Sequence, residues 1–135
     1  MHTAPSFEEL PSISPPCLEL ETWLRMTKLP YKKVIVTAQS FELAPKGKIP
    51  FIEYQEKPIG DVFLIIEMLK QTEGIGLDAN LTSAERSIFL AFRRTIEENT
   101  YWGSTQIRFD IEENWQRYRV LVARALFPDA PLEVS

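Results

Sequence analysis

The sequence is poor in the residues that most kinds of enzyme centre require. Its 135 residues include one cysteine and one histidine. A single cysteine, Cys17, cannot form an internal disulfide, and the simplest interpretation is a cytoplasmic protein. A single histidine, His2, near an end that we expect to fray, provides no material for a zinc cluster or a Ser/His/Asp triad. We therefore expect no metal site.

Charge and hydropathy exclude two further classes of protein. The formal net charge is −4 and no basic stripe runs along the chain, so nucleic acid is not an expected partner. The apolar runs are far shorter than a membrane span, and residues 1–5 do not resemble a signal peptide. The chain also contains no phosphate-cradling glycine loop. With 44% hydrophobic and 25% charged residues, its composition is that of an ordinary soluble protein with a core.

Helical and extended patterns follow one another in the first part of the chain. Prolines interrupt residues 1–16, and an amphipathic helix then begins at Pro16 and stops at Pro30. β-branched residues predict a strand from Tyr31 to Thr37, whereas 38–44 fits either a helical turn or a loop. The helix has an apolar stripe of Cys17, Leu20, Trp23 and Leu24, and a side that we expect to face water, with Glu19, Glu21, Arg25 and Lys28.

The loop 45–50 leads into a predicted β-hairpin. One strand covers Phe51 to Tyr54, a short turn follows, and the second strand returns to Gly60. Asp61 then caps a helix that continues to about residue 70.

The composition shifts after Gly76, where a linker leads to helices alone. Thr82 and Glu85 have the spacing of a capping box, in which two backbone N–H groups are satisfied reciprocally. A long amphipathic helix follows. A second helix begins near Glu112 and stops at Pro128. These patterns indicate an α/β domain followed by an all-helical one.

Several phrases resemble one protein family in their order and spacing. "PKGKIPFIEY" and "IGDVFLIIEML" are similar to the second half of the thioredoxin-like domain of glutathione transferases. "PSISPPCLELETWLRMTKLPYKKV" resembles more narrowly the metaxin and failed-axon-connections branch, in which a Ser-Pro-x-Cys turn opens the first helix. "LTSAERSIFLAF" is similar to the first helix of the second domain. The resemblance implies an α/β thioredoxin-like domain, residues 1–76, followed by a truncated all-α transferase C-terminal domain, residues 82–135.

Two features depart from the family pattern. The family's domain begins with a strand that is central in the sheet, between the second strand and the hairpin. Here only ten residues precede Pro11, and Pro5 is among them. The first strand is therefore very short, supplied differently, or absent. At the other end, the family's helical domain has several more helices than the two that this sequence predicts.

The resemblance implies a glutathione site that begins at the turn before the first helix. By position, Ser14 would donate a hydrogen bond to the glutathione sulfur and favour its thiolate. Ser14 is equally interpreted as a simple turn or N-cap residue. Cys17 is the second candidate for thiol chemistry. Because it lies on the apolar stripe, we expect it to be buried and a poor nucleophile.

The loop and the following helix cap complete the implied site. We predict a cis bond between Ile49 and Pro50, which would turn the Ile49 backbone outward to pair with the cysteinyl residue of glutathione. Lys48 would meet the glycyl carboxylate, or it is simply solvated. Asp61 and Val62 stand where the family has an acid followed by serine. The serine hydroxyl that holds the γ-glutamyl carboxylate is therefore missing, although the backbone N–H remains.

Three functions remain open, and the sequence does not decide whether the chain is an enzyme. The first is a glutathione transferase that conjugates glutathione to a small electrophile. Candidates for its co-substrate pocket are Arg93, Arg94, Tyr101 and Trp102, although Arg93 and Trp102 are also interpreted as a surface charge and an interdomain packing group. The second is a non-catalytic, metaxin-like module for protein assembly. The third is a degenerate fragment that has lost both roles. We also expect a homodimer, because a gap at the first strand and missing helices would leave backbone groups unpaired and apolar side chains exposed.

Overall fold

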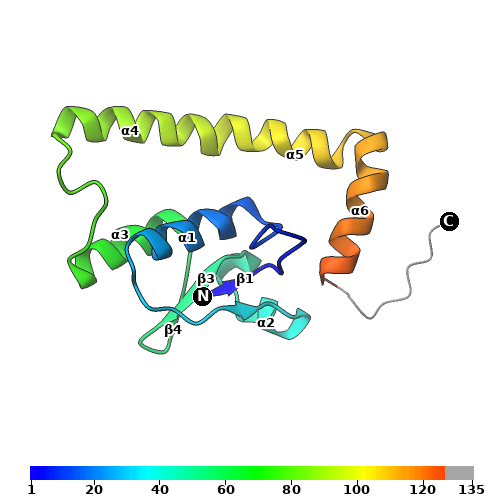
Figure 1. Ribbon diagram of the computed structural model, residues 1–135, viewed down its shortest axis with the longest axis horizontal. Coiled ribbons are helices and arrows are strands. Elements are labelled where there is room, and N and C mark those ends of the chain that lie inside the picture. The colour runs from blue at the N-terminus through cyan, green and yellow to red at the C-terminus, as the bar shows by residue number, and fades with distance from the viewer. Residues whose placement is uncertain (127–135) are drawn as a thin grey trace. The chain divides into compact units, whose positions relative to one another are not determined.

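The computed structural model describes residues 1–126, and the chain divides into two compact units (Figure 1). The first unit, Met1–Gly76, is α/β, and the second begins at Leu77 and is helical. The elements of the first unit are β1 (His2–Thr3), α1 (Pro15–Met26), β2 (Val34–Ile35), α2 (Ala38–Glu42), the 3₁₀ turn η1 (Pro45–Gly47), β3 (Phe51–Tyr54), β4 (Lys57–Gly60) and α3 (Val62–Glu73). Beyond them lie α4 (Ser83–Thr95), the π-helical segment η2 (Ile96–Thr100), α5 (Tyr101–Phe109) and α6 (Glu112–Leu126).

The sheet has the strand arrangement that the resemblance implies. Its order is β2-β1-β3-β4, with β1 parallel to β2 and antiparallel to β3. The first strand is therefore present and central, in two residues. Of the alternatives that the sequence left open, the very short strand is correct. The helix α1 connects β1 to β2, since two parallel strands need a crossover. The predicted α/β class is confirmed.

The expectation that His2 lies at a frayed end is wrong. His2 is only 7% exposed, and its ring stacks on Phe51 with the centroids 4.1 Å apart. Its Nε2 lies 2.5 Å from Oε1 of Glu53, on the neighbouring strand. The amine of Met1 also donates to the carbonyl of Lys32, at 2.7 Å. A two-residue strand shows no alternation of apolar and polar residues, so the sequence pattern did not reveal it.

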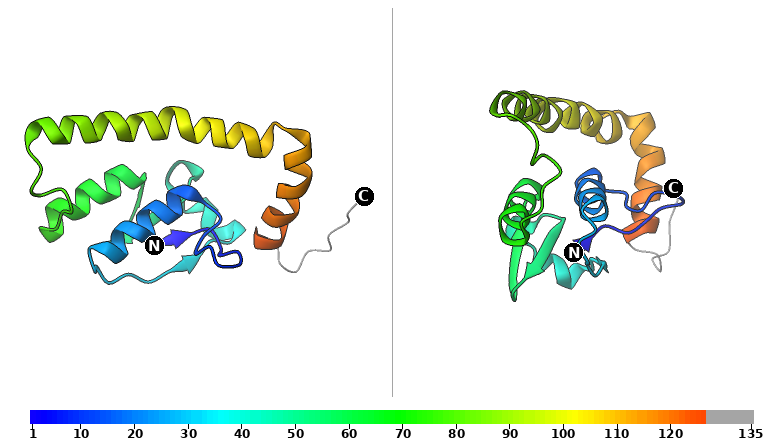
Figure 2. Two further views of the ribbon diagram at one scale, coloured as in Figure 1. Left: turned by 45° about the horizontal axis from the view of Figure 1, so that its top comes forward. Right: turned by 60° about the vertical axis from the view of Figure 1, so that its left-hand side comes forward.

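The predicted hairpin is confirmed, and side chains of its first strand pack on both faces of the sheet. Gln55 and Glu56 have φ of 49° and 65°, which is the backbone of a two-residue hairpin turn. Side chains alternate across a strand, so Phe51 packs with Val36 and Ala44 on the face of α2, whereas Ile52 joins the larger cluster under α1 and α3. Figure 1 and the right-hand view of Figure 2 show α1 and α3 on one side of the strands and α2 on the other.

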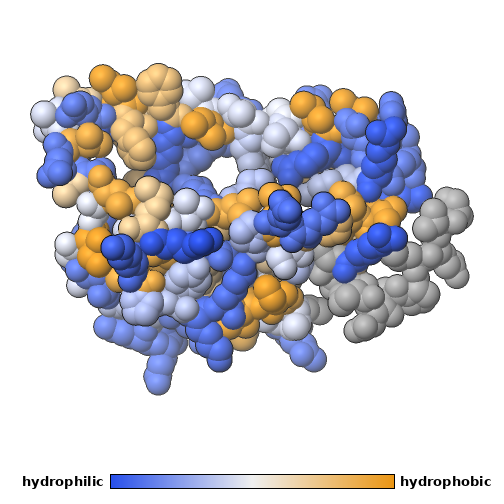
Figure 3. Space-filling view, viewed as in Figure 1, coloured by the Kyte–Doolittle hydropathy of each residue, from blue (hydrophilic) through white to orange (hydrophobic). Residues whose placement is uncertain are grey.

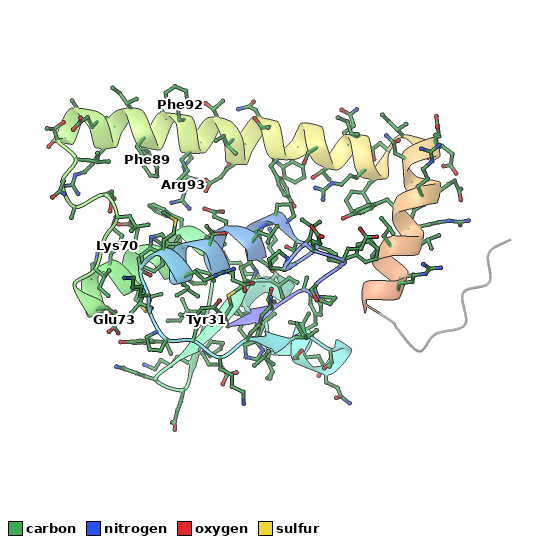
Figure 4. The ribbon with its side chains drawn as sticks, viewed as in Figure 1. Tyr31, Lys70, Glu73, Phe89, Phe92 and Arg93 are labelled. Carbon is green, nitrogen blue, oxygen red and sulfur yellow. The ribbon has the colours of Figure 1, made fainter. Side chains whose placement is uncertain are left out.

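The first helix begins one residue earlier than predicted, and one of its charged residues points inward. Glu21, which we expected to face water, is 8% exposed. One of its carboxylate oxygens accepts a hydrogen bond from Lys33 Nζ at 2.8 Å, and the other accepts from the Tyr31 hydroxyl at 3.3 Å. Burial and the neighbouring Glu21 carboxylate raise the pKa of Tyr31. Figure 4 labels Tyr31 among the side chains of the first unit. A buried carboxylate needs such partners, which helical spacing alone does not show.

The segments on either side of α1 differ in part from expectation. The predicted strand over 31–37 is reduced to Val34–Ile35, and the ambiguous stretch 38–44 contains the short helix α2. Thr37 caps that helix, because its hydroxyl oxygen accepts the N–H of Ser40 at 3.3 Å.

The capping box predicted at the start of the helical unit is confirmed. Thr82 Oγ1 accepts the N–H of Glu85 at 3.3 Å, and Glu85 Oε2 accepts the N–H of Thr82 at 2.8 Å. The long predicted helix is α4, η2 and α5 in succession, with the π-helical segment at Ile96–Thr100. The second predicted helix is α6. Its predicted stop at Pro128 lies outside the described residues.

The helices of the second unit have apolar side chains but no core of their own. Among the described residues from Leu77 onward, none is buried. Phe89 and Phe92 project from α4 in Figure 4, and hydrophobic residues gather along that helix in Figure 3. Within residues 1–126, no helix has the length and apolar character needed to cross a membrane. The exposed large apolar residues of this unit are Leu77, Ile88, Phe89, Leu90, Phe92, Ile96, Trp102, Ile107, Phe109 and Ile111.

Candidate functional site

The turn before α1 presents a hydroxyl that is not used to cap the helix. Ser14 is the N-cap residue, with φ of −102° and ψ of 117°, and its side chain makes no capping hydrogen bond. Pro15 and Pro16 occupy the first two helical positions and have no N–H to donate. Cys17 is thus the first residue of α1 with a backbone donor. The half-buried Ser14 side chain therefore lies at a helix N-terminus without a capping role.

The second candidate for thiol chemistry is enclosed by the core. Cys17 is a free cysteine with no exposed surface, packed in the cluster that contains Leu20 and Leu24. The predicted burial is confirmed. A thiol at this position cannot touch a ligand at the surface unless the core opens, so the geometry favours Ser14 over Cys17 as the group that reaches a ligand.

The loop from Pro45 to Pro50 has the predicted backbone. The Ile49–Pro50 peptide is cis. Pro50 is buried, Ile49 is half-buried and Lys48 is exposed. The loop is seated against β4 at Gly60, where an added Cβ would lie 3.0 Å from Cβ of Pro45. A glycine at this position permits the close approach of η1 to the strand.

The start of α3 carries a strained acidic residue. Asp61 has φ of 71° and ψ of 117°, a conformation that costs a non-glycine residue of order 1–3 kcal/mol and that concentrates at ligand sites. Its carboxylate caps α3 as predicted, since Oδ1 accepts the N–H of Leu64 at 3.2 Å. Val62 follows with its side chain in the core, at 9% exposure. The position that holds serine in the family is thus filled by a packed apolar group.

The turn before α1, the loop 45–50 and the start of α3 all contribute side chains to one apolar cluster. Ile13, which precedes Ser14, packs against the same apolar cluster as Ile49 at the loop and Val62 at the start of α3. Of the residues that the resemblance assigns to a glutathione site, the charged ones are Lys48 and Asp61, and both are exposed. Within residues 1–126 there is no group of three His, Cys, Asp or Glu side chains that could hold a metal ion.

Sequence reasoning missed a residue next to the site. Ser12 has no exposed surface, and its hydroxyl lies between the carbonyl of Ala4 and the N–H of Ser14. The phrase "PSISPP" contains two serines, and only the conformation of the turn shows which of them is buried.

The co-substrate candidates in the helical unit are engaged with neighbours on their own helix. Arg93 donates from Nε to Oε1 of Glu97 at 2.6 Å, and its side chain is 11% exposed (Figure 4). Arg94 donates to the other oxygen of Glu97 at 3.1 Å. Trp102 is exposed and packs edge-on against Tyr101, with ring centroids 5.5 Å apart. These contacts are typical of a helix surface and do not by themselves define a pocket.

Comparison with known proteins gives two informative relatives. Failed axon connections from Drosophila melanogaster is 37% identical over 93 residues, which cover 69% of this chain and 22% of that protein. The isoprene-epoxide–glutathione S-transferase from Rhodococcus sp. (strain AD45) is 35% identical over 112 residues, 81% of this chain and 47% of that protein. The chain thus spans less than half the length of either relative. No solved structure matches the chain.

A family model gives the assignment that these relatives support. The model described as the glutathione S-transferase N-terminal domain matches residues 15–115, which include both the α/β unit from α1 onward and most of the helical unit. The resemblance predicted from "PSISPPCLELETWL" and the later phrases is confirmed. With most of its length matched, the chain belongs to the glutathione S-transferase-like family, as defined by that N-terminal domain.

Proposed function

We propose that this chain binds glutathione and that Ser14 stabilises the thiolate of the bound tripeptide. The observation that carries the proposal is the Ser14 hydroxyl at the N-terminus of α1, which makes no capping hydrogen bond and is followed by two prolines without N–H groups. A hydroxyl that donates to a sulfur anion lowers the free energy of the thiolate relative to the thiol. A hydrogen bond to a charged partner is worth about 1.5–3 kcal/mol.

The rest of the tripeptide would be held by the loop and the start of α3. The half-buried Ile49 would pair through its backbone with the cysteinyl residue, in the manner of an added strand. The exposed Lys48 would attract the glycyl carboxylate. The Asp61 carboxylate, which already caps α3, would accept a charge-assisted hydrogen bond from the γ-glutamyl ammonium. Lys48 and Asp61 would thus each pair with one oppositely charged group of glutathione.

The proposed reaction is the addition of glutathione to a small electrophile. The thiol releases its proton to solvent, the thiolate sulfur attacks carbon, and a carbon–sulfur bond forms. If the electrophile is an epoxide, the carbon–oxygen bond breaks and the departing alkoxide takes a proton from water. Ser14 keeps its own proton throughout and acts only by hydrogen bonding. The Rhodococcus relative is named for an epoxide, so a small epoxide is the first substrate class to test.

The compartment proposed for this activity is the cytoplasm. The single cysteine is a buried free thiol, which suits a reducing environment, and glutathione is the thiol that maintains such an environment.

A second candidate function is a non-catalytic module for protein assembly. It is favoured by Val62, whose buried side chain offers no hydroxyl to a γ-glutamyl carboxylate. The relative Failed axon connections, whose name describes no catalytic activity, matches 69% of the chain. The two functions differ in one measurable property, because only the first requires glutathione to bind.

The proposal is tested by binding and by two substitutions. We expect the chain to be retained on immobilised glutathione and eluted by the free tripeptide. Ser14→Ala should lower the rate of conjugation to a general aryl halide or a small epoxide by about ten- to a hundredfold, which is the kinetic equivalent of the lost hydrogen bond. Cys17→Ala is the matched control, because Cys17 is the other candidate for thiol chemistry and lies in the first turn of α1.

The expected result for Cys17→Ala is a less stable protein with unchanged activity. Removing a fully buried side-chain atom costs of order 1–3 kcal/mol of unfolding free energy. Activity lost in a folded Cys17→Ala protein and kept in Ser14→Ala would reverse the assignment. Absence of any glutathione binding by the unsubstituted chain would favour the assembly module instead.

A further inference from the structure

A buried serine connects the Ser14 turn to the central strand. The Ser12 hydroxyl donates to the carbonyl of Ala4 at 3.2 Å, and its oxygen accepts the backbone N–H of Ser14 at 3.3 Å. Ser12 has no exposed surface. A hydroxyl has one proton to donate and two lone pairs to accept, so both bonds can exist together. Ser12 therefore connects the carbonyl of Ala4, the residue after β1, to the backbone N–H of Ser14.

The turn has few other means of fixing its conformation. Pro15 and Pro16 have no N–H groups, and the Ser14 side chain does not cap the helix. The turn is instead held by bonds to distant parts of the chain. The N–H of Ile13 donates to the carbonyl of Pro5 at 3.0 Å, and Lys33 Nζ donates to the carbonyl of Pro11 at 2.7 Å. Within residues 1–126, the Ser14 N–H donates to the Ser12 hydroxyl oxygen and to no backbone carbonyl.

We propose that Ser12 is a positioning residue for Ser14, an inference that rests on the proposed role of Ser14 towards the glutathione thiolate. Ser12 does not touch the ligand. It holds the backbone of Ser14 at a fixed distance from the central strand, and so sets where the Ser14 hydroxyl points. A displacement of about 1 Å at a reacting centre can cost about a hundredfold in rate, so a single bond to the carrying residue has a measurable effect.

The structure provides a matched control at the same carbonyl. Thr3, which also has no exposed surface, donates from Oγ1 to the carbonyl of Ala4 at 3.3 Å, but it makes no bond to the turn. Thr3→Val and Ser12→Ala therefore each remove one hydroxyl bond to the Ala4 carbonyl. Only Ser12→Ala also removes the acceptor of the Ser14 N–H.

The experiment measures the thiol pKa of bound glutathione by the ultraviolet absorbance of the thiolate as a function of pH. For the unsubstituted chain we expect a value below that of free glutathione, and for Ser14→Ala a return towards the free value. Ser12→Ala should raise the bound thiol pKa by about one unit, which corresponds to about tenfold less thiolate at a fixed pH below it. Thr3→Val should leave it unchanged. Ser12→Ala added to Ser14→Ala should have no further effect on it.

A second variant and a ligand-free measurement protect the test from a folding failure. Ser12→Cys keeps a buried group of similar size with a much weaker donor, so it should shift the thiol pKa in the same direction. In the free protein, hydrogen exchange of the Ser14 amide should be at least tenfold faster in either Ser12 variant than in Thr3→Val. An unchanged thiol pKa in Ser12→Ala, beside a clear shift in Ser14→Ala, would overturn the positioning role and leave the proposed function standing. A bound thiol pKa equal to that of free glutathione in the unsubstituted chain would overturn both.

Discussion

At the scale of single residues, the α/β unit is stabilised by polar groups that the sequence pattern assigned to solvent. Glu21 is the clearest case, because helical spacing placed it on the water-facing side of α1 and the structure buries it against Lys33 and Tyr31. His2 is another, since in the central strand β1 it stacks on Phe51 of the neighbouring strand β3. Hydrophobic periodicity identifies apolar positions, and it has no signal for a charge that is buried with its partner.

The Glu21–Lys33 pair gives the first prediction on stability. Lys33→Met should lower the free energy of unfolding by about 2–3 kcal/mol, because the Glu21 carboxylate would stay buried with the Tyr31 hydroxyl as its main donor. The cost is somewhat below that of breaking a fully buried pair, since the Lys33 side chain is 29% exposed. Chemical denaturation measures the difference.

The neighbouring lysine is the control for that measurement. Lys32 is exposed, and Lys32→Met should change the free energy of unfolding by no more than about 0.5 kcal/mol. Equal effects of the two substitutions would show that the loss of a surface charge, and not the buried pair, determines the stability.

At the scale of elements, the sequence predicted best where a local rule decides the structure. The hairpin from Phe51 to Gly60, the cap at Asp61 and the capping box at Thr82 were all predicted, since each depends on a few adjacent residues. The strand at His2–Thr3 has no local signal in the sequence, because its pairing with β2 and β3 is entirely long-range. The sequence predicts that the turn 11–14 belongs to a site, but it does not reveal the hydrogen bond between Ser14 and Ser12. Residue type alone does not distinguish the buried serine from the half-buried one.

The capping box of α4 gives a prediction on pH. Hydrogen bonds from the backbone and side chain of Thr82 lower the pKa of the Glu85 carboxyl. A carboxyl whose pKa is lower in the folded state stabilises that state above its unfolded pKa, and the contribution disappears as the pH falls through the folded pKa. At neutral pH, Glu85→Gln should therefore have a lower denaturation midpoint than the unsubstituted chain. The difference between the two denaturation midpoints should disappear on acidification, because a protonated Glu85 is neutral, as glutamine is.

Denaturation midpoints at neutral and at acidic pH test the role of the capping box. The control is Glu98→Gln, because the Glu98 carboxylate is exposed and lies 3.8 Å from Nη1 of Arg94. We expect the midpoint of that variant to follow the unsubstituted chain at every pH. A gap for Glu85→Gln that persists below the carboxyl's pKa would contradict an electrostatic origin for the cap's contribution.

At the scale of the whole molecule, the α/β unit has clusters of buried apolar side chains, and the described part of the helical unit has none. The α/β unit has two apolar clusters, one on each face of its sheet, and its first strand closes the gap that the sequence left open. The expectation of unpaired backbone at that strand therefore no longer supports self-association. The exposed helical surface still supports it. Ile88, Phe92 and Ile96 recur at every fourth residue of α4 and η2 and are 58%, 67% and 59% exposed.

That stripe gives the last prediction, that the chain associates with a second copy of itself. Amphipathic helices gain most of their stability from the packing of their apolar face, and the described part of the helical unit buries none of its side chains. We expect sedimentation at micromolar concentration to give a dimer. Phe92→Glu should shift the chain towards monomer, because it places a charge in the middle of the stripe. The control Leu43→Glu changes a leucine that is 65% exposed in the other unit, and it should leave the dimer intact. A monomer that melts cooperatively without either substitution would show that the helical surface is stable without a second copy.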